Sequence, residues 1–127
     1  MRLVAALFVI TTTDVLLQLS LGGLLTFNFI DPHVHIVSGF VLFFLTIATM
    51  VASIASKPRP RSLLATSFAL VLLVILQALL GFDTLDTGNQ AIAWVHFIIA
   101  MAIYGTAISG TFIAIRASQI KRVQPTA

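Results

Sequence analysis

The chain contains no cysteine and few charged residues. Without cysteine it can form no disulfide, no thiolate metal ligand and no thiol nucleophile. Only 9% of its 127 residues are charged and 59% are hydrophobic, whereas about a quarter of the residues of a soluble domain are charged. The net charge of +3 does not indicate a nucleic-acid partner, because the basic residues lie at the ends of apolar segments. The composition therefore excludes an ordinary soluble domain and predicts an integral membrane protein in a lipid bilayer.

Four apolar segments account for most of the chain. Each is 21 to 26 residues long, and a helix needs about 20 residues to span a bilayer. We therefore expect an all-α integral membrane four-helix bundle that forms a single transmembrane domain over residues 1–127. The predicted helices are Leu3–Phe27, Pro32–Ser56, Ser62–Phe82 and Ala91–Arg116.

The charges predict how the helices are oriented. Three of the four acidic residues, Asp31, Asp83 and Asp86, fall in the two loops that follow the first and third segments. The basic residues all fall on the opposite side, and cytoplasmic loops are enriched in lysine and arginine. We therefore expect a multi-pass protein of the cell membrane with both termini in the cytoplasm. The seven basic residues are Arg2, Lys57, Arg59, Arg61, Arg116, Lys121 and Arg122.

Two local signals mark the boundaries of the second helix. Asp31 followed by Pro32 is typical of a helix start, because a carboxylate caps free N–H groups and proline fits the first turn. Pro58 and Pro60 are expected to end this helix and to separate two helical hairpins.

The second hairpin repeats features of the first. The match aligns Gln18 with Gln77 at an offset of 59 residues, and His35 with His96 at an offset of 61. Polar residues inside membranes are rare, so these matches carry more weight than leucine matches. The order of the segments predicts a pseudo-two-fold axis along the membrane normal. The matched segments are LQLSLG (17–22) with LQALLG (76–81), and VHIVSG (34–39) with VHFIIA (95–100).

The histidines lie near the outer ends of the second and fourth helices. At 1.5 Å per residue, His35 and His96 are about 4.5 and 7.5 Å from the predicted helix starts. Residues two apart on a helix differ by about 200° around its axis, so His33 faces away from the site of His35 and is interpreted as an interfacial residue. Gly39 and Ala100 lie one turn deeper on the faces of His35 and His96, where a flat ligand edge can approach.

Two histidines at similar depth on different helices are the arrangement that holds a haem iron by both faces. The alternatives are interfacial histidines without a cofactor and histidines that hydrogen-bond between helices. A zinc site is disfavoured, because zinc needs more ligands and the nearby aspartates lack ligand spacing.

Three further polar residues lie within the apolar segments. Gln18 and Gln77 are candidates for hydrogen bonds to a cofactor or to the second nitrogen of a ligand histidine, or for links between helices. Asp14 lies near the middle of the first helix, and a carboxylate inside the membrane is a candidate functional residue. Asp14 would take up and release protons, or it would contact a partner subunit.

With its paired histidines and its glutamine–glycine segments LQLSLGG and LQALLGF, the chain resembles one half of the haem A synthase family. The resemblance covers residues 17 to about 105, and short single-half members are expected in archaea. It implies a bis-histidine haem site near the outer face, with His35 and His96 as iron ligands. The family oxidises a methyl group of haem O to form haem A. Where its catalytic half carries a glutamate and an arginine, this chain has Pro32 and Ile36.

The resemblance leaves three classes of function open. The first is a haem A synthase-like oxidoreductase with haem O as substrate and haem A as product. The second is a haem b protein that transfers electrons near a respiratory terminal oxidase. The third is a cofactor-free structural subunit of a larger respiratory membrane complex. A terminal oxidase or a haem biosynthesis protein is the expected partner, and two copies as a homo-oligomer would rebuild the double-half architecture.

Overall fold

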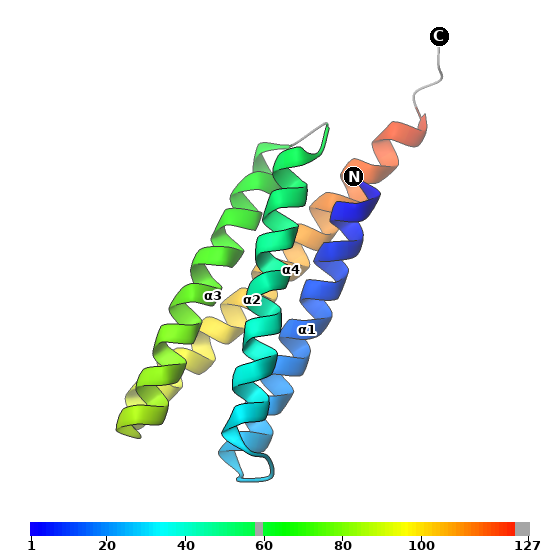
Figure 1. The fold of residues 1–127 in the computed structure, drawn as a ribbon. Coiled ribbons are helices and arrows are strands. Elements are labelled where there is room, and N and C mark those ends of the chain that lie inside the picture. The colour runs from blue at the N-terminus through cyan, green and yellow to red at the C-terminus, as the bar shows by residue number, and fades with distance from the viewer. Residues whose placement is uncertain (58–59, 124–127) are drawn as a thin grey trace.

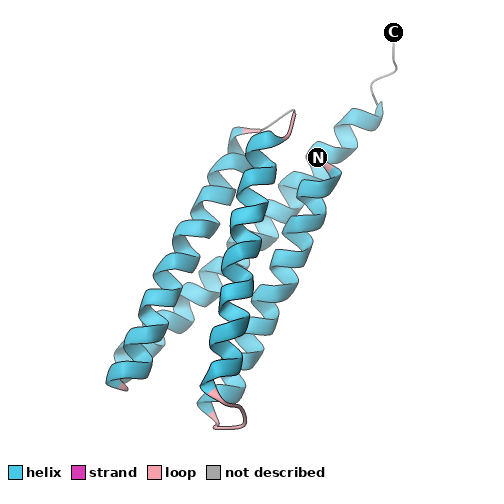
Figure 2. Cartoon of the chain, in the orientation of Figure 1, coloured by secondary structure: helices cyan, strands magenta, loops and turns pink. Residues whose placement is uncertain are grey.

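The computed structural model describes residues 1–57 and 60–123, without the side chains of residues 120–123, and it consists of four helices (Figures 1 and 2). All four are long and apolar enough to cross a membrane, and the described residues contain no strand. The chain is therefore an all-α four-helix bundle with the character of a multi-pass membrane protein, as predicted. The helices are α1 (Arg2–Thr26), α2 (Pro32–Ala55), α3 (Arg61–Thr87) and α4 (Gln90–Val123).

The predicted start of α2 is confirmed. Asp31 is its N-cap, and the Asp31 carboxylate accepts a hydrogen bond of 2.7 Å from the backbone N–H of His33. Pro32 occupies the first turn. Backbone N–H groups in the first turn have no acceptor within the helix, so proline, which lacks an N–H, removes no hydrogen bond there. The helix ends at Ala55, and Pro60 is the N-cap of α3. Pro58 and Arg59 lie outside the described residues.

The predicted ends of α3 and α4 are wrong. α3 continues to Thr87, so Asp83 and Asp86 lie in its last turns rather than in a loop. It ends where Gly88 adopts a left-handed conformation with φ of 63° and donates its N–H to a carbonyl of the last turn. Hydropathy marks only the apolar part of a helix, and no helix-breaking residue lies between 82 and 88. For the same reason α4 continues seven residues beyond Arg116.

Helices that follow one another in the chain pack together, and α4 closes the bundle against α1. Within the described residues, the backbones of α1 and α3 do not approach each other closely, nor do those of α2 and α4. These two pairs therefore lie on the diagonals of the bundle, with α2 in front of α4 in Figure 1. Because the diagonal partners are also the repeat partners, the pseudo-two-fold axis runs along the bundle.

The two ends of the bundle differ in charge. The start of α1, the α2–α3 connection and the end of α4 lie together at one end, here called the basic end (Figure 1). Arg2, Lys57 and Arg61 are at this end. The α1–α2 and α3–α4 turns form the opposite end, here called the histidine end. Arg59 and the side chains of Lys121 and Arg122 lie outside the described residues.

The repeat is visible in the pattern of burial. The four buried residues of α1 have buried counterparts in α3 at the 59-residue offset, and those of α2 have buried counterparts in α4 at the 61-residue offset. Both hairpins therefore turn the same faces to the centre. The first set pairs Val4, Phe8, Thr11 and Val15 with Leu63, Ser67, Leu70 and Val74. The second pairs Leu42, Thr46, Thr49 and Ser53 with Ile103, Ala107, Gly110 and Ala114.

Hydroxyl groups link the helices inside this core. Thr11 of α1 hydrogen-bonds to Thr49 of α2 at 3.1 Å, and both side chains are fully buried. Ser67 of α3 donates to Ser53 of α2 at 2.9 Å. In lipid there is no hydrophobic force between helices, so such bonds, each contributing about 0.6 kcal/mol, and close packing hold the bundle together.

The core occupies only half of the bundle. No residue from 16 to 41 or from 75 to 102 is buried, although these ranges make up the histidine half of all four helices. The two hairpins also diverge toward the histidine end in Figure 1. The basic half therefore stabilises the fold, and the histidine half, which holds the predicted site, is loosely packed.

Candidate functional site

His35 of α2 and His96 of α4 face each other across the diagonal of the bundle. Their ring centres are 6.4 Å apart and the ring planes are inclined by 69°. Both side chains are half-buried. Since the two residues are repeat partners, they lie on opposite sides of the pseudo-two-fold axis. The structure thus brings together the two histidines that the sequence pairs.

Gln77 of α3 binds both nitrogens of His96. The Nδ1 atom of His96 is 3.0 Å from the Gln77 backbone carbonyl, and Nε2 is 2.9 Å from the Gln77 side-chain nitrogen. A carbonyl only accepts, so Nδ1 carries the proton, and Nε2 accepts from the amide. A hydrogen bond from Nδ1–H to a carbonyl is the usual support for an imidazole that binds metal through its other nitrogen. The backbone of Gln77 therefore fixes the orientation of His96 and leaves the proton on its Nδ1 atom.

Two glycines allow the imidazoles to approach the odd-numbered helices. A Cβ atom placed on Gly81 would lie 3.0 Å from Cε1 of His96, which is closer than an ordinary contact. A Cβ atom on Gly22 would lie 3.6 Å from Cε1 of His35. Each glycine follows its glutamine by four residues, on the same helix face. These two glycines belong to the site, and the spacing Q-x-x-x-G in both hairpins was the signal that could have identified them.

The first hairpin differs from the second in the partner of its glutamine. The Gln18 side chain donates to the hydroxyl of Ser38, whereas the residue that matches Ser38 in the second hairpin is Ile99. Ile99 has no acceptor, which leaves the Gln77 amide to pair with His96. Gly39, predicted to border a ligand, faces Gln18: a Cβ atom there would lie 3.9 Å from the Gln18 amide oxygen.

Two polar atoms at this site have no partner. Nδ1 of His35 and the side-chain oxygen of Gln77 are shielded from solvent and make no hydrogen bond. A buried polar atom left unpaired costs about 1–3 kcal/mol, so most such atoms have a protein or water partner. The two unpaired atoms therefore give this site hydrogen-bonding capacity that the described residues do not use.

The separation of the rings suits a single metal ion. An imidazole nitrogen lies about 2 Å from a metal that it binds, so two nitrogens on opposite sides of one ion are about 4 Å apart. Ring centres at 6.4 Å allow this once the two nitrogens turn toward each other. In the described part of the chain no cluster of three or more histidine, cysteine or acidic residues occurs. Two histidines would be enough for a haem iron, because the porphyrin supplies the other four ligands.

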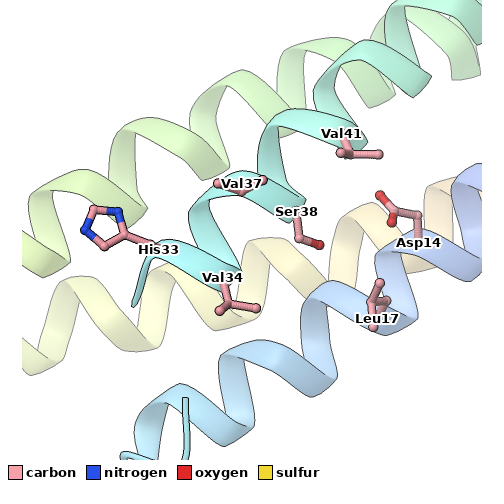
Figure 3. Close-up of a pocket in the computed structure, with 7 residues that line it drawn as sticks. All are labelled: Asp14, Leu17, His33, Val34, Val37, Ser38 and Val41. Atoms are coloured by element: carbon pink, nitrogen blue, oxygen red, sulfur yellow. The ribbon is translucent and has the colours of Figure 1, made fainter. Parts of the chain in front are cut away.

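Asp14 and His33 do not join this site. They line a separate open groove on the outside of α1 and α2 (Figure 3). Nearly all of the groove's other lining side chains are apolar. The structure therefore separates the predicted site residues into a histidine site between the helices and a carboxylate-bearing groove that faces outward.

Comparison with protein-family models, curated proteins and solved structures gives no match to this chain.

Proposed function

We propose that this chain is a haem-binding membrane protein in which His35 and His96 are the two axial ligands of the iron. The observation that carries the proposal is the facing pair of repeat-related imidazoles, with ring centres 6.4 Å apart. They lie in the half of the bundle that has no buried side chains. Bundle cores hold cofactors between facing helices in the same way.

The chain's own residues would prepare the ligands. The Gln77 carbonyl holds the proton of His96 on Nδ1, which leaves the Nε2 lone pair for iron. The Gln77 side chain now donates to this lone pair and would turn away when the iron binds. The glycines at 22 and 81 leave space for the rings beside α1 and α3.

The proposed role is electron transfer near a respiratory oxidase, or a step in haem A biosynthesis. A bound haem would supply reversible one-electron chemistry, and if His35 and His96 both held the iron they would leave no position for O₂ or another ligand. This favours electron transfer over oxidation of a substrate. The resemblance to the haem A synthase family supports the second role. In that role the protein would be an enzyme with haem O as its substrate.

The proposal includes an orientation in the cell membrane. Arg2, Lys57 and Arg61 lie at the end of the bundle opposite to the histidines. The preference of basic residues for the cytoplasmic side supports an orientation with both termini in the cytoplasm. The haem would lie in the outer leaflet.

A cofactor-free structural subunit is the second candidate, and one observation favours it. Both nitrogens of His96 already hydrogen-bond to Gln77, so this histidine links α3 to α4 without any ligand. Bonds of this kind stabilise membrane helices by about 0.6 kcal/mol each. Such a subunit would purify colourless and would remain so when haem is supplied.

Titration with haem b distinguishes the candidates. The purified protein in mild detergent should take up one equivalent of haem and show the sharp absorption bands of low-spin iron. An enzyme would also convert haem O to haem A when produced beside a source of haem O, whereas an electron carrier would leave haem O unchanged. Absence of any specific uptake would reject both haem functions in favour of the structural subunit.

A further inference from the structure

The groove between α1 and α2 reaches from the surface of the membrane to its interior. It has a volume of about 580 Å³ and is open to the outside of the bundle, and Figure 3 shows the residues that line it. From His33 to Val41 it covers about 12 Å along α2 at 1.5 Å per residue. Asp14 lies about 18 Å along α1 from Arg2, close to the middle of a hydrocarbon core about 30 Å thick. The lining residues are Asp14, Leu17, His33, Val34, Val37, Ser38 and Val41.

The inner part of the groove contains an unpaired acceptor and a donor. The Oδ2 atom of Asp14 is shielded from solvent and has no hydrogen-bond partner, and the side chain projects from α1 toward α2 (Figure 3). Ser38 accepts a hydrogen bond from Gln18, which leaves the Ser38 hydroxyl hydrogen to donate. A ligand that both donates and accepts would satisfy the two groups. A purely apolar lipid chain would leave both unsatisfied.

The internal repeat shows that the fold does not require these polar side chains. At the matching positions of the second hairpin, Asp14 is replaced by Leu73 and Ser38 by Ile99. The second hairpin nevertheless buries the same faces as the first. Ser38 links α2 to α1 through its hydrogen bond with Gln18, but no hydrogen bond between helices accounts for Oδ2 of Asp14.

We propose that this groove binds a prenylated hydroquinone, with a ring hydroxyl donating to Asp14. The valine side chains would pack against the flat ring, and Ser38 would donate to a ring oxygen. The depth of Asp14 in the membrane favours this class of molecule over other lipids. Phospholipids and other lipid alcohols keep their polar heads at the membrane surface. A prenylated hydroquinone dissolves in the hydrocarbon core and brings its hydroxyl groups to the depth of Asp14. This site does not depend on haem being bound.

Photolabelling tests the proposal in the full chain. The probe is a short-chain prenylated hydroquinone with a photoreactive group, kept reduced and added to the protein in phosphatidylcholine nanodiscs. Mass spectrometry should locate the label on residues 14–17 and 33–41, and unlabelled hydroquinone should compete. Asp14→Leu, which introduces the residue found at the matching position 73, removes the acceptor and should weaken competition about fivefold, the net effect of losing one hydrogen bond. Asp83→Leu is the matched control and should change nothing.

A second variant leaves the carboxylate in place. Val37→Trp fills the groove and should abolish the label, whereas Val51→Trp, which is exposed on α2 outside the groove, should not. Labelling spread over all four helices, or unchanged labelling in both Asp14→Leu and Val37→Trp, would overturn the proposal. Equal competition by the oxidised quinone, or by a simple alcohol such as decanol, would reject hydroquinone as the ligand.

Discussion

His35 and His96 occupy equivalent positions of a duplicated hairpin, yet their hydrogen bonds differ. His96 is bonded through both nitrogens to Gln77, whereas Nδ1 of His35 is buried without a partner. One substitution between the repeats, serine at 38 against isoleucine at 99, accounts for the different partners of the two glutamines. The two imidazoles are therefore not equally prepared for a ligand, and the following predictions use this difference.

Replacing Gly81 by alanine should disturb His96. The added Cβ atom would lie 3.0 Å from Cε1 of the ring, so the ring must move away from α3 and stretch its bond to the Gln77 carbonyl. Loss of such a supporting bond weakens metal binding by about tenfold or more. Haem titration of Gly81→Ala should show this loss. Gly22→Ala is the matched control, because its Cβ atom makes an ordinary 3.6 Å contact with His35. Equal effects of the two substitutions would contradict the assignment.

Replacing Gln77 by methionine should strengthen haem binding. The change removes the amide that competes for Nε2 of His96 and keeps the backbone carbonyl that orients the ring. The net value of one hydrogen bond, about 1 kcal/mol, corresponds to a gain of about fivefold in affinity. The protein without haem should lose about 0.6 kcal/mol of stability. Gln18→Met, which breaks a bond to Ser38 instead, should leave the affinity unchanged. Weaker haem binding in Gln77→Met would show that the amide assists the ligand.

Replacing Gly110 by alanine should destabilise the basic half of the bundle. A Cβ atom at Gly110 would lie 2.0 Å from the ring of Phe8, and Phe8 is fully buried, so the ring has no space to retreat. Overpacking of this kind costs about 1–3 kcal/mol. Reversible unfolding in mixed detergent micelles should show the loss, and Phe8→Leu should partly restore stability. Gly105→Ala, whose Cβ atom would have no neighbour within 4 Å, should be neutral. Equal losses in both glycine variants would disprove the Phe8–Gly110 contact.

The fold was largely predictable from the sequence, because hydropathy locates helices that must satisfy their backbone internally in lipid. The charge distribution predicted which helix ends lie together, and the repeat predicted a pseudo-two-fold axis along the bundle. The end of α3 was placed five residues early, since its last turns carry Asp83 and Asp86 and are no longer apolar. Helix length beyond the hydrocarbon region depends on caps such as Gly88 rather than on hydropathy.

The site was predictable only in part. The histidine pair follows from the repeat, but the contact residues depend on helix rotation, which a sequence match does not determine. The sequence suggested Gly39 as a residue beside a ligand, but it did not identify Gly22 and Gly81, which lie against the rings. The different partners of Gln18 and Gln77 depend on a residue of the neighbouring helix, at position 38 or 99. Such choices between partners follow from three-dimensional packing.

The cysteine-free sequence allows a direct test of the orientation. Single variants Lys57→Cys and Asp86→Cys place one thiol at the basic end and one at the histidine end. A maleimide that does not cross membranes should label Asp86→Cys in intact cells and Lys57→Cys only after lysis, because the basic end is expected in the cytoplasm. The reverse pattern would place the histidines near the cytoplasm and would contradict the proposed orientation.

The most direct test of the central claim is a reduced-minus-oxidised visible spectrum of the purified protein, recorded beside His35→Ala, His96→Ala and His33→Ala. His33 is the matched control, because it lies two residues from His35 and lines the outer groove. The proposal predicts a sharp low-spin haem signal in the parent and in His33→Ala, and its loss in both of the other variants. A parent that stays colourless despite an adequate supply of haem, or a signal that survives both His35→Ala and His96→Ala, would contradict the proposed haem site.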